Sequence, residues 1–453
     1  MKVLKFGGTS VGSAERMKSL TKIIPAGEQV VVVLSAMAGT TNMLVDIADI
    51  AIKGDKEKAQ ASLQEVQENY LKVISELYQT EEYQKNARRT ISLIFNDAFN
   101  AIETETGSHL EKLILSIGEI ISTNLFHLYL WETGIPSVLL PSLSYMRIDK
   151  DGEPDMYYVS ENISRLMEEA KEMDVYITQG FICRNAKGEI DNLKRGGSDY
   201  TAAIIGNAIN AEEVQIWTDI DGFHNNDPRY VSNTKPIRNL SFDEAAELAY
   251  FGAKILHPAT IHPCRKKGIP VLLKNTLEPE NPGTLITASY QASNLKAVAA
   301  KSGITAIKIR SSRMLMAHGF LKRVFEVFDS YKTSVDMITT SEVAVSLTID
   351  DDARLPEIVA ELEQFSVVEV DLKQAIICIV GDFVAERPGS ALKIMEALHD
   401  IPIRMISYGG SSHNISLLVS EEHKIPTLQL IQPVLNESQP ENQPRIEGFK
   451  LIS

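Results

Sequence analysis

Residues 3–10 read Val3-Leu4-Lys5-Phe6-Gly7-Gly8-Thr9-Ser10, a short apolar run that leads into two adjacent glycines. This order predicts a buried strand, a glycine turn and a helix that begins near Ser13. Adjacent glycines expose backbone N–H groups to a ligand, and a helix N-terminus attracts an anion. Because Lys5 adds a cation in front of the glycines, we interpret the turn as a phosphate-binding loop rather than an ordinary tight connection. It is not a Walker loop, in which the lysine follows the glycines.

A second glycine loop reads Arg195-Gly196-Gly197-Ser198-Asp199-Tyr200-Thr201. A predicted strand at 175–178 precedes it, and a helix that Ser198 or Asp199 caps begins near Ala202. The Arg195 guanidinium offers a planar fork that matches a carboxylate or a phosphate. Taken alone, the loop fits an ordinary turn equally well, and Asp199 fits either a structural partner of the cations or a group that orients one of them. Two basic glycine loops in one chain favour an anion-binding or phosphate-transfer site.

Composition argues against several classes of protein. The 453 residues are enough for about three domains, and the net charge of −15 without a basic block argues against nucleic-acid binding. Cys183, Cys264 and Cys378 are too few and too scattered for a disulfide framework or a zinc cluster. We therefore expect reduced thiols, no protein-bound metal and a cytoplasmic protein. The N-terminus lacks the apolar core of a signal peptide, and we expect no apolar run of membrane-spanning length.

Predicted strands and helices alternate up to about residue 295. Apolar runs at 30–34, 214–217 and 270–274 predict strands, and residues 43–130 are predicted to be mainly helical. This alternation predicts an α/β fold, with a mostly parallel sheet sandwiched by helices. Ligands of such sheets bind beyond the carboxyl ends of the strands, where both glycine loops fall.

A different pattern follows residue 300. It predicts a βαββαβ unit, with strands and helices in turn at 305–309, 319–331, 335–338, 343–349, 355–365 and 367–370. The pattern recurs about 70 residues later, where Gly389 and Ile403-Arg404-Met405-Ile406 repeat Gly319 and Val335-Asp336-Met337-Ile338. Tandem units of this kind commonly sense small molecules, although they also serve as packing or dimerisation modules. The predicted domains are a catalytic domain at 1–295, repeats at 303–372 and 373–437, and a tail at 438–453.

Five motifs together resemble the aspartokinase family. They are Lys5-Phe6-Gly7-Gly8-Thr9-Ser10-Val11, Arg195-Gly196-Gly197-Ser198-Asp199, Trp217-Thr218-Asp219, Asp227-Pro228-Arg229 and Phe251-Gly252-Ala253-Lys254-Ile255-Leu256-His257-Pro258. Their order and spacing are specific, and the resemblance extends through the two repeats, which look like ACT domains. It implies an amino-acid-kinase fold followed by two ACT-like domains. Residues 333–342 are most similar to the lysine-sensitive monofunctional class, and the length leaves no room for a fused homoserine dehydrogenase.

The resemblance implies ATP-dependent phosphorylation of the β-carboxylate of L-aspartate to 4-phospho-L-aspartate, the first step of lysine, threonine and methionine biosynthesis. The residues agree with that chemistry. A free carboxylate has a pKa of about 4, so the nucleophile is ionised at neutral pH without a general base. The difficulty is to bring two anions together, and cations and backbone dipoles should therefore carry most of the catalysis.

The family pattern implies a role for each residue around the substrate. Lys5 contacts the transferring phosphate, and Asp199 orients Lys5 or helps to hold the substrate amine. Arg195 binds the α-carboxylate of aspartate, and Glu119 binds its ammonium group. From its surroundings alone, Glu119 also fits an exposed charge at the edge of an apolar helix. The same pocket is lined by Ser35 and Thr41.

For ATP, the pattern implies contacts through Lys5, Gly7, Gly8, Thr218, Asp219, Arg229 and Lys254. Thr218 and Asp219 lie near the nucleoside, and Arg229 and Lys254 contact the phosphates. Lys254 also fits a surface lysine of a helix predicted at 243–256. Mg²⁺ arrives with ATP and is held by phosphate oxygens, so no protein ligand is assigned. Two positions depart from the family pattern: His224, where tyrosine is common, and Lys194, where glycine is usual.

The lysine-sensitive class binds its effector, lysine, in the first ACT unit at the interface with a partner subunit. The matching positions are Met314, Gly319, Leu321, Val335, Asp336, Ser341 and Glu342. Asp336 and Glu342 can hold the cationic groups of lysine, and N–H groups around Gly319 can receive its carboxylate. Ala317 replaces a serine of the family, which removes one hydroxyl contact. We expect a homodimer or higher homo-oligomer, joined through the ACT-like domains at residues 305–420.

Two other functions stay open at this point. One is a kinase of the same fold for glutamate, acetylglutamate or a nucleotide, which Glu119 and the ACT-like repeats disfavour. The other is an amino-acid-sensing regulator with an inactive kinase domain. The presence of Lys5, Arg195 and Asp199 disfavours that second alternative.

Overall fold

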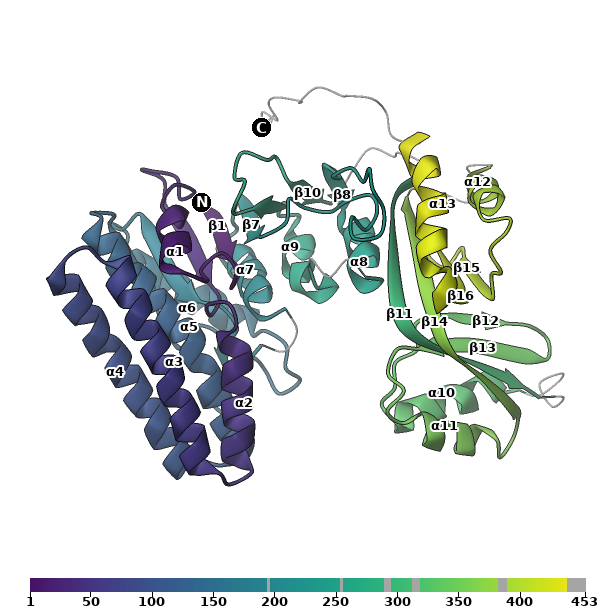
Figure 1. The fold of residues 1–453 in the computed structure, drawn as a ribbon, viewed down its shortest axis with the longest axis horizontal. Coiled ribbons are helices and arrows are strands. Elements are labelled where there is room, and N and C mark those ends of the chain that lie inside the picture. The colour runs from purple at the N-terminus through teal and green to yellow at the C-terminus, as the bar shows by residue number, and fades with distance from the viewer. Residues whose placement is uncertain (194–195, 253–255, 289–294, 312–317, 382–388, 438–453) are drawn as a thin grey trace. The chain divides into compact units, whose positions relative to one another are not determined.

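The computed structural model describes residues 1–193, 196–252, 256–288, 295–311, 318–381 and 389–437. The chain divides into two compact units (Figure 1). Unit 1 consists of Met1–Phe223, Arg238–Phe242 and Ile255–Tyr290, and unit 2 of His224–Ile237, Asp243–Lys254 and Gln291–Ser453. Two short segments before residue 255 thus belong to the same unit as the C-terminal repeats. The domain boundaries proposed from the sequence stay predictions.

Unit 1 contains an eight-stranded sheet in the order β3-β4-β2-β1-β7-β9-β10-β8. The strands are β1 (Lys2–Phe6), β2 (Val30–Leu34), β3 (Ser137–Leu140), β4 (Val175–Gln179), β7 (Glu213–Thr218), β8 (Asn239–Ser241), β9 (Val271–Asn275) and β10 (Thr284–Thr287). The sheet is parallel from β3 to β9, β10 is antiparallel to β9, and β8 is parallel to β10. Every residue of β2 is buried, which explains its unbroken apolar run. The predicted α/β fold is confirmed.

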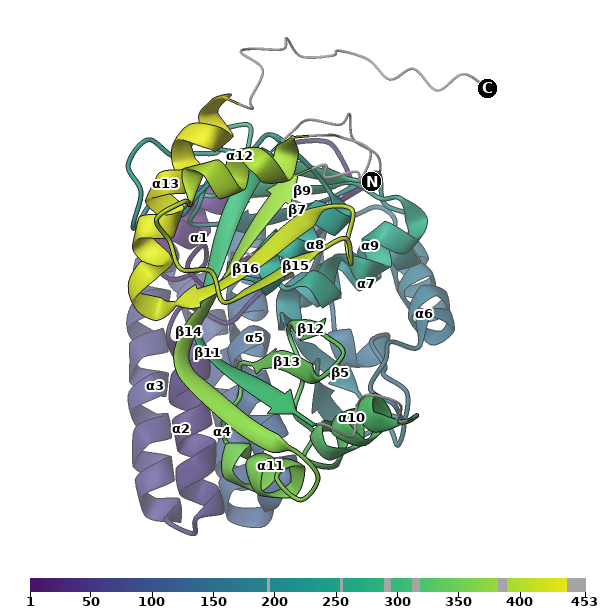
Figure 2. The same cartoon turned by 90° about the vertical axis from the view of Figure 1, so that its right-hand side faces the viewer.

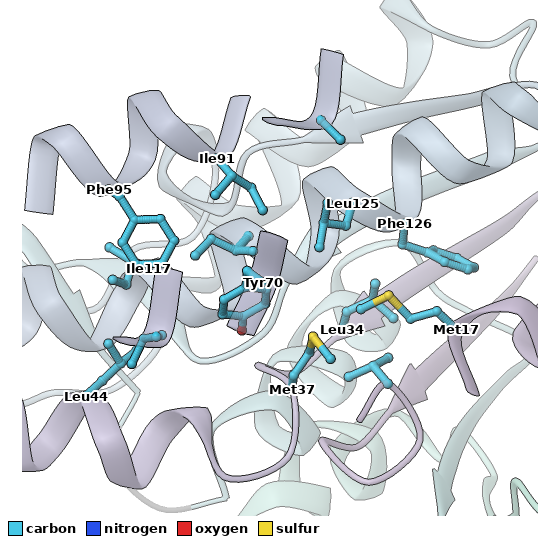
Figure 3. Packing of buried hydrophobic residues seen from close by; sticks show 14 of the residues in the cluster. Met17, Leu34, Met37, Leu44, Tyr70, Ile91, Phe95, Ile117, Leu125 and Phe126 are labelled. Atoms are coloured by element: carbon cyan, nitrogen blue, oxygen red, sulfur yellow. The ribbon is translucent and has the colours of Figure 1, made fainter. Parts of the chain in front are cut away.

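The predicted helical region after β2 is formed by four helices that lie side by side (Figure 1). In Figure 3, Leu44, Tyr70, Phe95 and Ile117 contribute one residue from each of these four helices to the same core. The helices of unit 1 are α1 (Ala14–Leu20), α2 (Thr40–Ile52), α3 (Lys56–Leu77), α4 (Glu81–Thr104), α5 (Gly107–Glu132), α6 (Met156–Glu169), α7 (Gly197–Ala208) and α9 (His262–Lys267), with short 3-10 turns at Ser142–Ser144 and Pro258–Ile261. A separate hairpin consists of β5 (Ile182–Arg184) and β6 (Ile190–Asn192).

Helix α5 corrects one expectation about apolar segments. By length and composition it meets the criteria for a membrane-spanning helix, although no such run was expected from the sequence. Its most apolar stretch is 67% buried inside the protein, and the helix packs against α2 and α4. This burial is typical of a core helix, whose apolar surface is covered by neighbouring helices rather than by lipid.

Unit 2 contains a six-stranded antiparallel sheet in the order β12-β13-β11-β14-β16-β15 (Figure 2). The strands are β11 (Leu295–Arg310), β12 (Ile338–Thr340), β13 (Ala344–Ile349), β14 (Val367–Gly381), β15 (Met405–Tyr408) and β16 (Asn414–Ser420). The helices are α10 (Phe320–Ser330), α11 (Leu355–Leu362), α12 (Ser390–Ala397) and α13 (Lys424–Glu437), with a 3-10 turn at Glu421–His423. Helix α8 (Phe242–Tyr250) belongs to this unit from Asp243 onward.

The two long strands β11 and β14 serve both repeats. Residues 304–310 of β11 pair with β13 and with residues 367–371 of β14, which completes the first βαββαβ unit around α10 and α11. Residues 295–301 of β11 pair with residues 374–381 of β14, which also pair with β16. The second repeat therefore takes its fourth strand from residues that precede the first repeat, so the first repeat is inserted in the second. Each repeat has its own apolar cluster.

Candidate active site

Lys5 and Asp199 form the centre of the candidate site. Lys5 lies near the carboxyl end of β1, and its Nζ is 2.7 Å from Oδ1 of Asp199 on α7. Both side chains are largely buried. The prediction of a helix start near Ala202 with Ser198 or Asp199 as the cap is wrong, because α7 begins at Gly197 and is capped by Gly196. With a φ of 69°, Gly196 turns the chain in a conformation that favours glycine, and Asp199 consequently lies in the first helical turn.

The glycine loop after β1 is shaped by close backbone contacts. The N–H of Gly7 donates to the carbonyl of Trp217 at 3.1 Å. Helix α1 begins at Ala14, close to the predicted start, and Ser13 is its cap. A Cβ on Gly8 would lie 2.9 Å from the carbonyl oxygen of Ala36, closer than real Cβ atoms approach. A Cβ on Gly7 would lie 3.4 Å from Nζ of Lys5. Glycine therefore lets the two loops meet and keeps the surroundings of the Lys5 ammonium group open.

The carboxyl ends of three neighbouring strands bring the predicted residues together. Strand β1 lies between β2 and β7, which begin the two halves of the sheet, so the strand order reverses its direction there. Such a switch point is a position at which α/β proteins bind ligands. After β2, the N–H of Ser35 donates to the carbonyl of Phe6 at 3.2 Å. At the end of β7, the carbonyl of Thr218 accepts from the backbone and the side chain of Thr276 at 2.8 and 3.0 Å. Thr276 is in turn 2.6 Å from the hydroxyl of Ser10 in the glycine loop.

Glu119 is a buried carboxylate beside this loop cluster. It is 4% exposed on α5, so the reading as a surface charge is wrong. Among the described residues, its Oε2 has no hydrogen-bond partner. Burial raises the pKa of its carboxyl to about 7, and hydrogen bonds to the backbone of Ala36 and of Glu119 itself and the positive charge of Lys5 oppose the rise. A cationic group would satisfy both the open oxygen and the buried charge.

Three positions near Glu119 were not identified from the sequence. A Cβ on Gly118 would lie 2.7 Å from Cβ of Ala36, so glycine lets α5 approach the loop after β2. Thr40 is buried and its hydroxyl lies 3.0 Å from that of Tyr70, whereas the predicted Thr41 is exposed in the first turn of α2. The Gly118-Glu119 pair inside an apolar helix was the available signal for the close approach, but Thr40 and Tyr70 left none.

The predicted ATP residues are divided between the two units. Thr218 donates its hydroxyl to Oδ1 of Asp219 at 3.1 Å in unit 1. Arg229 belongs to unit 2, where its exposed guanidinium donates to both carboxylate oxygens of Asp227. The His224 ring, also in unit 2, lies 3.1 Å from the hydroxyl of Thr234. Outside the described residues lie Lys194, Arg195 and Lys254.

The predicted effector residues lie in three segments of the first repeat. Gly319 caps α10 and Leu321 lies in its first turn, Val335 and Asp336 precede β12, and Ser341 and Glu342 are exposed between β12 and β13. The Asp336 side chain is buried. Its Oδ1 accepts from the hydroxyl of Tyr250 at 2.6 Å and from Nζ of Lys301 at 3.2 Å. Burial raises the pKa of this carboxyl, and both partners oppose the rise. Outside the described residues lie Met314 and Ala317.

Comparison with known proteins identifies both parts of the chain. The amino acid kinase family model matches residues 1–275, and an ACT domain model matches residues 377–433. Lysine-sensitive aspartokinase 3 of Escherichia coli K12 is 35% identical over 96% of this chain and 99% of its own length. Chloroplastic aspartokinase 1 of Arabidopsis thaliana is 34% identical over 96% of this chain and 80% of its own.

Solved structures agree over the same length. E. coli aspartokinase III in complex with aspartate and ADP matches with a TM-score of 0.81 at 34% identity, over 96% of this chain and 100% of the other. The same enzyme in complex with lysine and aspartate matches with a TM-score of 0.80 at 35% identity, over 96% and 99% of the two chains. Together with the Lys5–Asp199 pair and the buried Glu119, these matches decide against a kinase for another substrate and against an inactive sensor. The chain belongs to the aspartokinase family and is an aspartate kinase.

Proposed function

We propose that this chain transfers the γ-phosphoryl group of ATP to the β-carboxylate of L-aspartate and forms 4-phospho-L-aspartate and ADP. The observation that carries this proposal is the buried Glu119 beside the Lys5–Asp199 pair. A substrate with both an ammonium group and a carboxylate satisfies the two opposite charges at once. The complex of the E. coli relative with aspartate and ADP supports the same pair of ligands.

Substrate binding needs one partner for each charge of aspartate. Glu119 holds the ammonium group, because its open Oε2 and its burial make a cation favourable there. Arg195 takes the α-carboxylate, since a guanidinium fork matches that group in two hydrogen bonds. The hydroxyl groups of Ser35 and Thr41 line the same pocket, and the β-carboxylate reacts without prior loss of a proton.

Phosphoryl transfer then depends on neutralising negative charge. Lys5 stabilises the charge that spreads over the oxygens of the transferring phosphoryl group, and the N–H groups of the Gly7-Gly8 loop contribute beside it. Asp199, 2.7 Å away, pairs with the ammonium group of Lys5 and directs it toward the transferring phosphoryl group. In this proposal ATP lies against the loop, where Gly7 places no side chain beside Nζ of Lys5. For the remaining parts of the nucleotide we assign Thr218, Asp219, Arg229 and Lys254.

Mg²⁺ enters with the nucleotide in this proposal. Within the described ranges, the side chains of histidine, cysteine, aspartate and glutamate form no group of three that could hold a metal ion. Mg²⁺ commonly binds substrate phosphates and retains several waters. We therefore assign the ion to the phosphate oxygens, where it screens their charge.

The substrate assignment is tested with Glu119→Gln. Removal of the carboxylate charge should raise the KM for aspartate roughly 10- to 100-fold, the range for a hydrogen bond to a charged group, and leave the KM for ATP within about twofold. ADP release in a coupled assay with L-aspartate, L-glutamate and N-acetylglutamate measures both constants and the substrate preference.

Glu161→Gln is the matched control, because Glu161 is an exposed glutamate on α6 of the same unit. It should behave as the wild type. An unchanged KM for aspartate in the Glu119→Gln variant, or a higher rate with another acceptor in the wild type, would contradict the assignment.

We further propose that the reaction is the first step of lysine, threonine and methionine biosynthesis and that lysine inhibits it. The name of the E. coli relative and its complex with lysine support this regulation. We assign the effector site to the seven positions of the first repeat that were named from the sequence. We also propose that two chains form a homodimer through residues 305–420. The three cysteines are free and buried, and the cytoplasmic location stays a prediction.

A further inference from the structure

The carboxylate assigned to the amine of the effector already holds an amine from the same chain. Nζ of Lys301 lies 3.2 Å from Oδ1 of Asp336 and 2.6 Å from Oδ2 of Asp350. It also lies 4.5 Å from the centre of the Tyr250 ring, over its face. Lys301 therefore presents to Asp336 the same chemical group, a primary ammonium, that a bound lysine would present.

Asp336 has little capacity for a second cation in this arrangement. Its Oδ1 accepts from both Lys301 and the Tyr250 hydroxyl, and its side chain is fully buried. The other oxygen, Oδ2, has no hydrogen-bond partner among the described residues and is shielded from solvent. Two ammonium groups at one buried carboxylate repel each other strongly, because a low-dielectric site screens their charges poorly.

Lys301 can leave Asp336 without losing every ionic partner. Asp350 is the closer of its two carboxylates, and its side chain is 37% exposed. A small rotation of the lysine side chain toward Asp350 would keep one ion pair and release Oδ1 of Asp336. The exchange of one amine for another at Asp336 is therefore physically accessible.

From these contacts we infer that Lys301 is an internal competitor of the effector, occupying the Asp336 carboxylate until the amine of a bound amino acid displaces it. This inference rests on the proposed role of Asp336 in lysine binding and adds Lys301 as the residue that limits the affinity of the protein for lysine.

Tyr250, which shares Oδ1 with Lys301, is the last residue of α8 and lies four positions before Lys254. A Cβ on Gly252 would lie 2.2 Å from the carbonyl oxygen of Ala300, so the chain after α8 packs against the residue next to Lys301. Displacement of Lys301 thus changes the contacts of the chain after α8, which leads to Lys254, a residue that we assign to the phosphates of ATP.

The test compares lysine binding by the full-length wild type with that of Lys301→Met and Lys301→Arg, by titration calorimetry. Methionine keeps the length and apolar stem of the side chain but removes its charge, so lysine should bind at least about fivefold more tightly and its inhibition curve should shift to lower concentration. Arginine keeps the competing charge, so that variant should bind lysine no more tightly than the wild type. Lys308→Met is the matched control: Lys308 is an exposed lysine of the same strand β11, and its loss should leave the affinity unchanged.

The outcomes separate this inference from the function on which it rests. If the wild type binds lysine and Lys301→Met binds it equally or less tightly, Lys301 does not compete with the effector and the inference is overturned. If Lys301→Met and Lys308→Met both bind more tightly, the effect comes from net charge and the inference is also overturned. If the wild type binds no lysine, the proposed regulation itself is wrong and the inference falls with it. Lys301→Gln, which keeps a hydrogen-bond donor without the charge, replaces the methionine variant if that protein fails to fold.

Discussion

The ammonium group of Lys5 is largely buried, and a buried charge is costly unless it is paired. Asp199 provides the partner from α7 at 2.7 Å, and Glu119 adds a second negative charge close enough to influence the same pocket. The Lys5–Asp199 pair and the nearby carboxyl of Glu119 thus place basic and acidic groups in one pocket. At the scale of single residues, the pairing of opposite charges thus decides what the pocket can bind.

Removal of Lys5 should affect the chemical step most. We expect Lys5→Ala to lower kcat by about a thousandfold or more, because the lost cation acts on charge that develops in the transition state. Steady-state kinetics of the purified variant measure this, with circular dichroism as the check on folding. Lys2→Ala, on the same strand but paired with Glu28 at 3.6 Å, serves as the control. Near-normal turnover of Lys5→Ala would exclude a catalytic role.

Glu119 should make substrate binding depend on pH. Burial raises the pKa of its carboxyl to about 7, so the group is mostly neutral below that pH and charged above it. Because only the charged form attracts an ammonium group, the KM for aspartate should fall as the pH rises from about 6 to about 8. The pH profile of the KM measures this, and Glu119→Gln should remove the dependence. If the Glu119→Gln variant keeps the same pH dependence of the KM for aspartate, the dependence does not come from Glu119.

The same carboxyl lowers stability at neutral and higher pH. Its pKa is about 7 in the folded chain and 4.5 when unperturbed, so the folded state holds the proton more tightly. The proton on Glu119 therefore adds to the free energy of unfolding. This contribution is fully present below pH 4.5 and is lost as the pH rises through about 7, a difference of about 3 kcal/mol. Glu119→Gln should therefore unfold at a higher temperature than the wild type near pH 8 and at a similar temperature near pH 4, measured by calorimetry. A lower unfolding temperature at pH 8 would contradict the buried-charge account.

At the scale of elements, the site depends on how closely α5 approaches the loop after β2. Gly118 allows this approach, since a Cβ there would lie 2.7 Å from Cβ of Ala36. The same packing places Glu119 within reach of the Ala36 backbone, which helps to hold the carboxylate. A helix that is mostly core in its composition therefore carries one charged residue, Glu119, to the proposed substrate pocket.

Gly118→Ala tests this contact between elements. Alanine favours a helix by about 1 kcal/mol over glycine, but overpacking of a closed core costs roughly 1–3 kcal/mol, so we expect net destabilisation. The KM for aspartate should rise while that for ATP changes little, because Glu119 moves with α5. Gly410→Ala is the control, because a Cβ there meets nothing within 4 Å. A Gly118→Ala variant with normal stability and KM would show that the two elements can separate without consequence.

At the scale of the whole molecule, the ACT-like sheet has two edge strands, β12 and β15. Open strand edges and exposed apolar side chains favour pairing with another chain, and Ile338 of β12 is 37% exposed. We expect the wild type to be a homodimer in light scattering and Ile338→Asp to shift it toward the monomer. Leu93→Asp, at an exposed apolar position of α4 in unit 1, should leave the dimer intact. A monomeric wild type at working concentration would contradict a dimer through residues 305–420.

Much of this architecture could be predicted from contiguous residues. The apolar run at Val30–Leu34 predicted a fully buried strand, and the helical region after it was correctly identified. The first glycine loop predicted a helix start near Ser13, and α1 begins at Ala14. The start of α7 was predicted incorrectly, because its cap is Gly196, a glycine in a left-handed conformation, rather than one of the polar residues that usually cap helices. Lys5 and Asp199 were proposed as site residues from the two glycine loops, and Glu119 from the family pattern, whereas Thr40 and Tyr70 were not proposed.

Only the tertiary structure decided which distant residues meet. Local backbone preference and hydrophobic period depend on neighbours in the chain, and they determined the elements and the glycine loops of this protein. Strand pairing depends on hydrogen bonds between residues far apart, so residues 295–301 gave no sign that they complete the second repeat rather than begin the first. The same reason applies to Lys301: its three partners come from α8 and from two segments beyond β11, and only folding places them around one ammonium group.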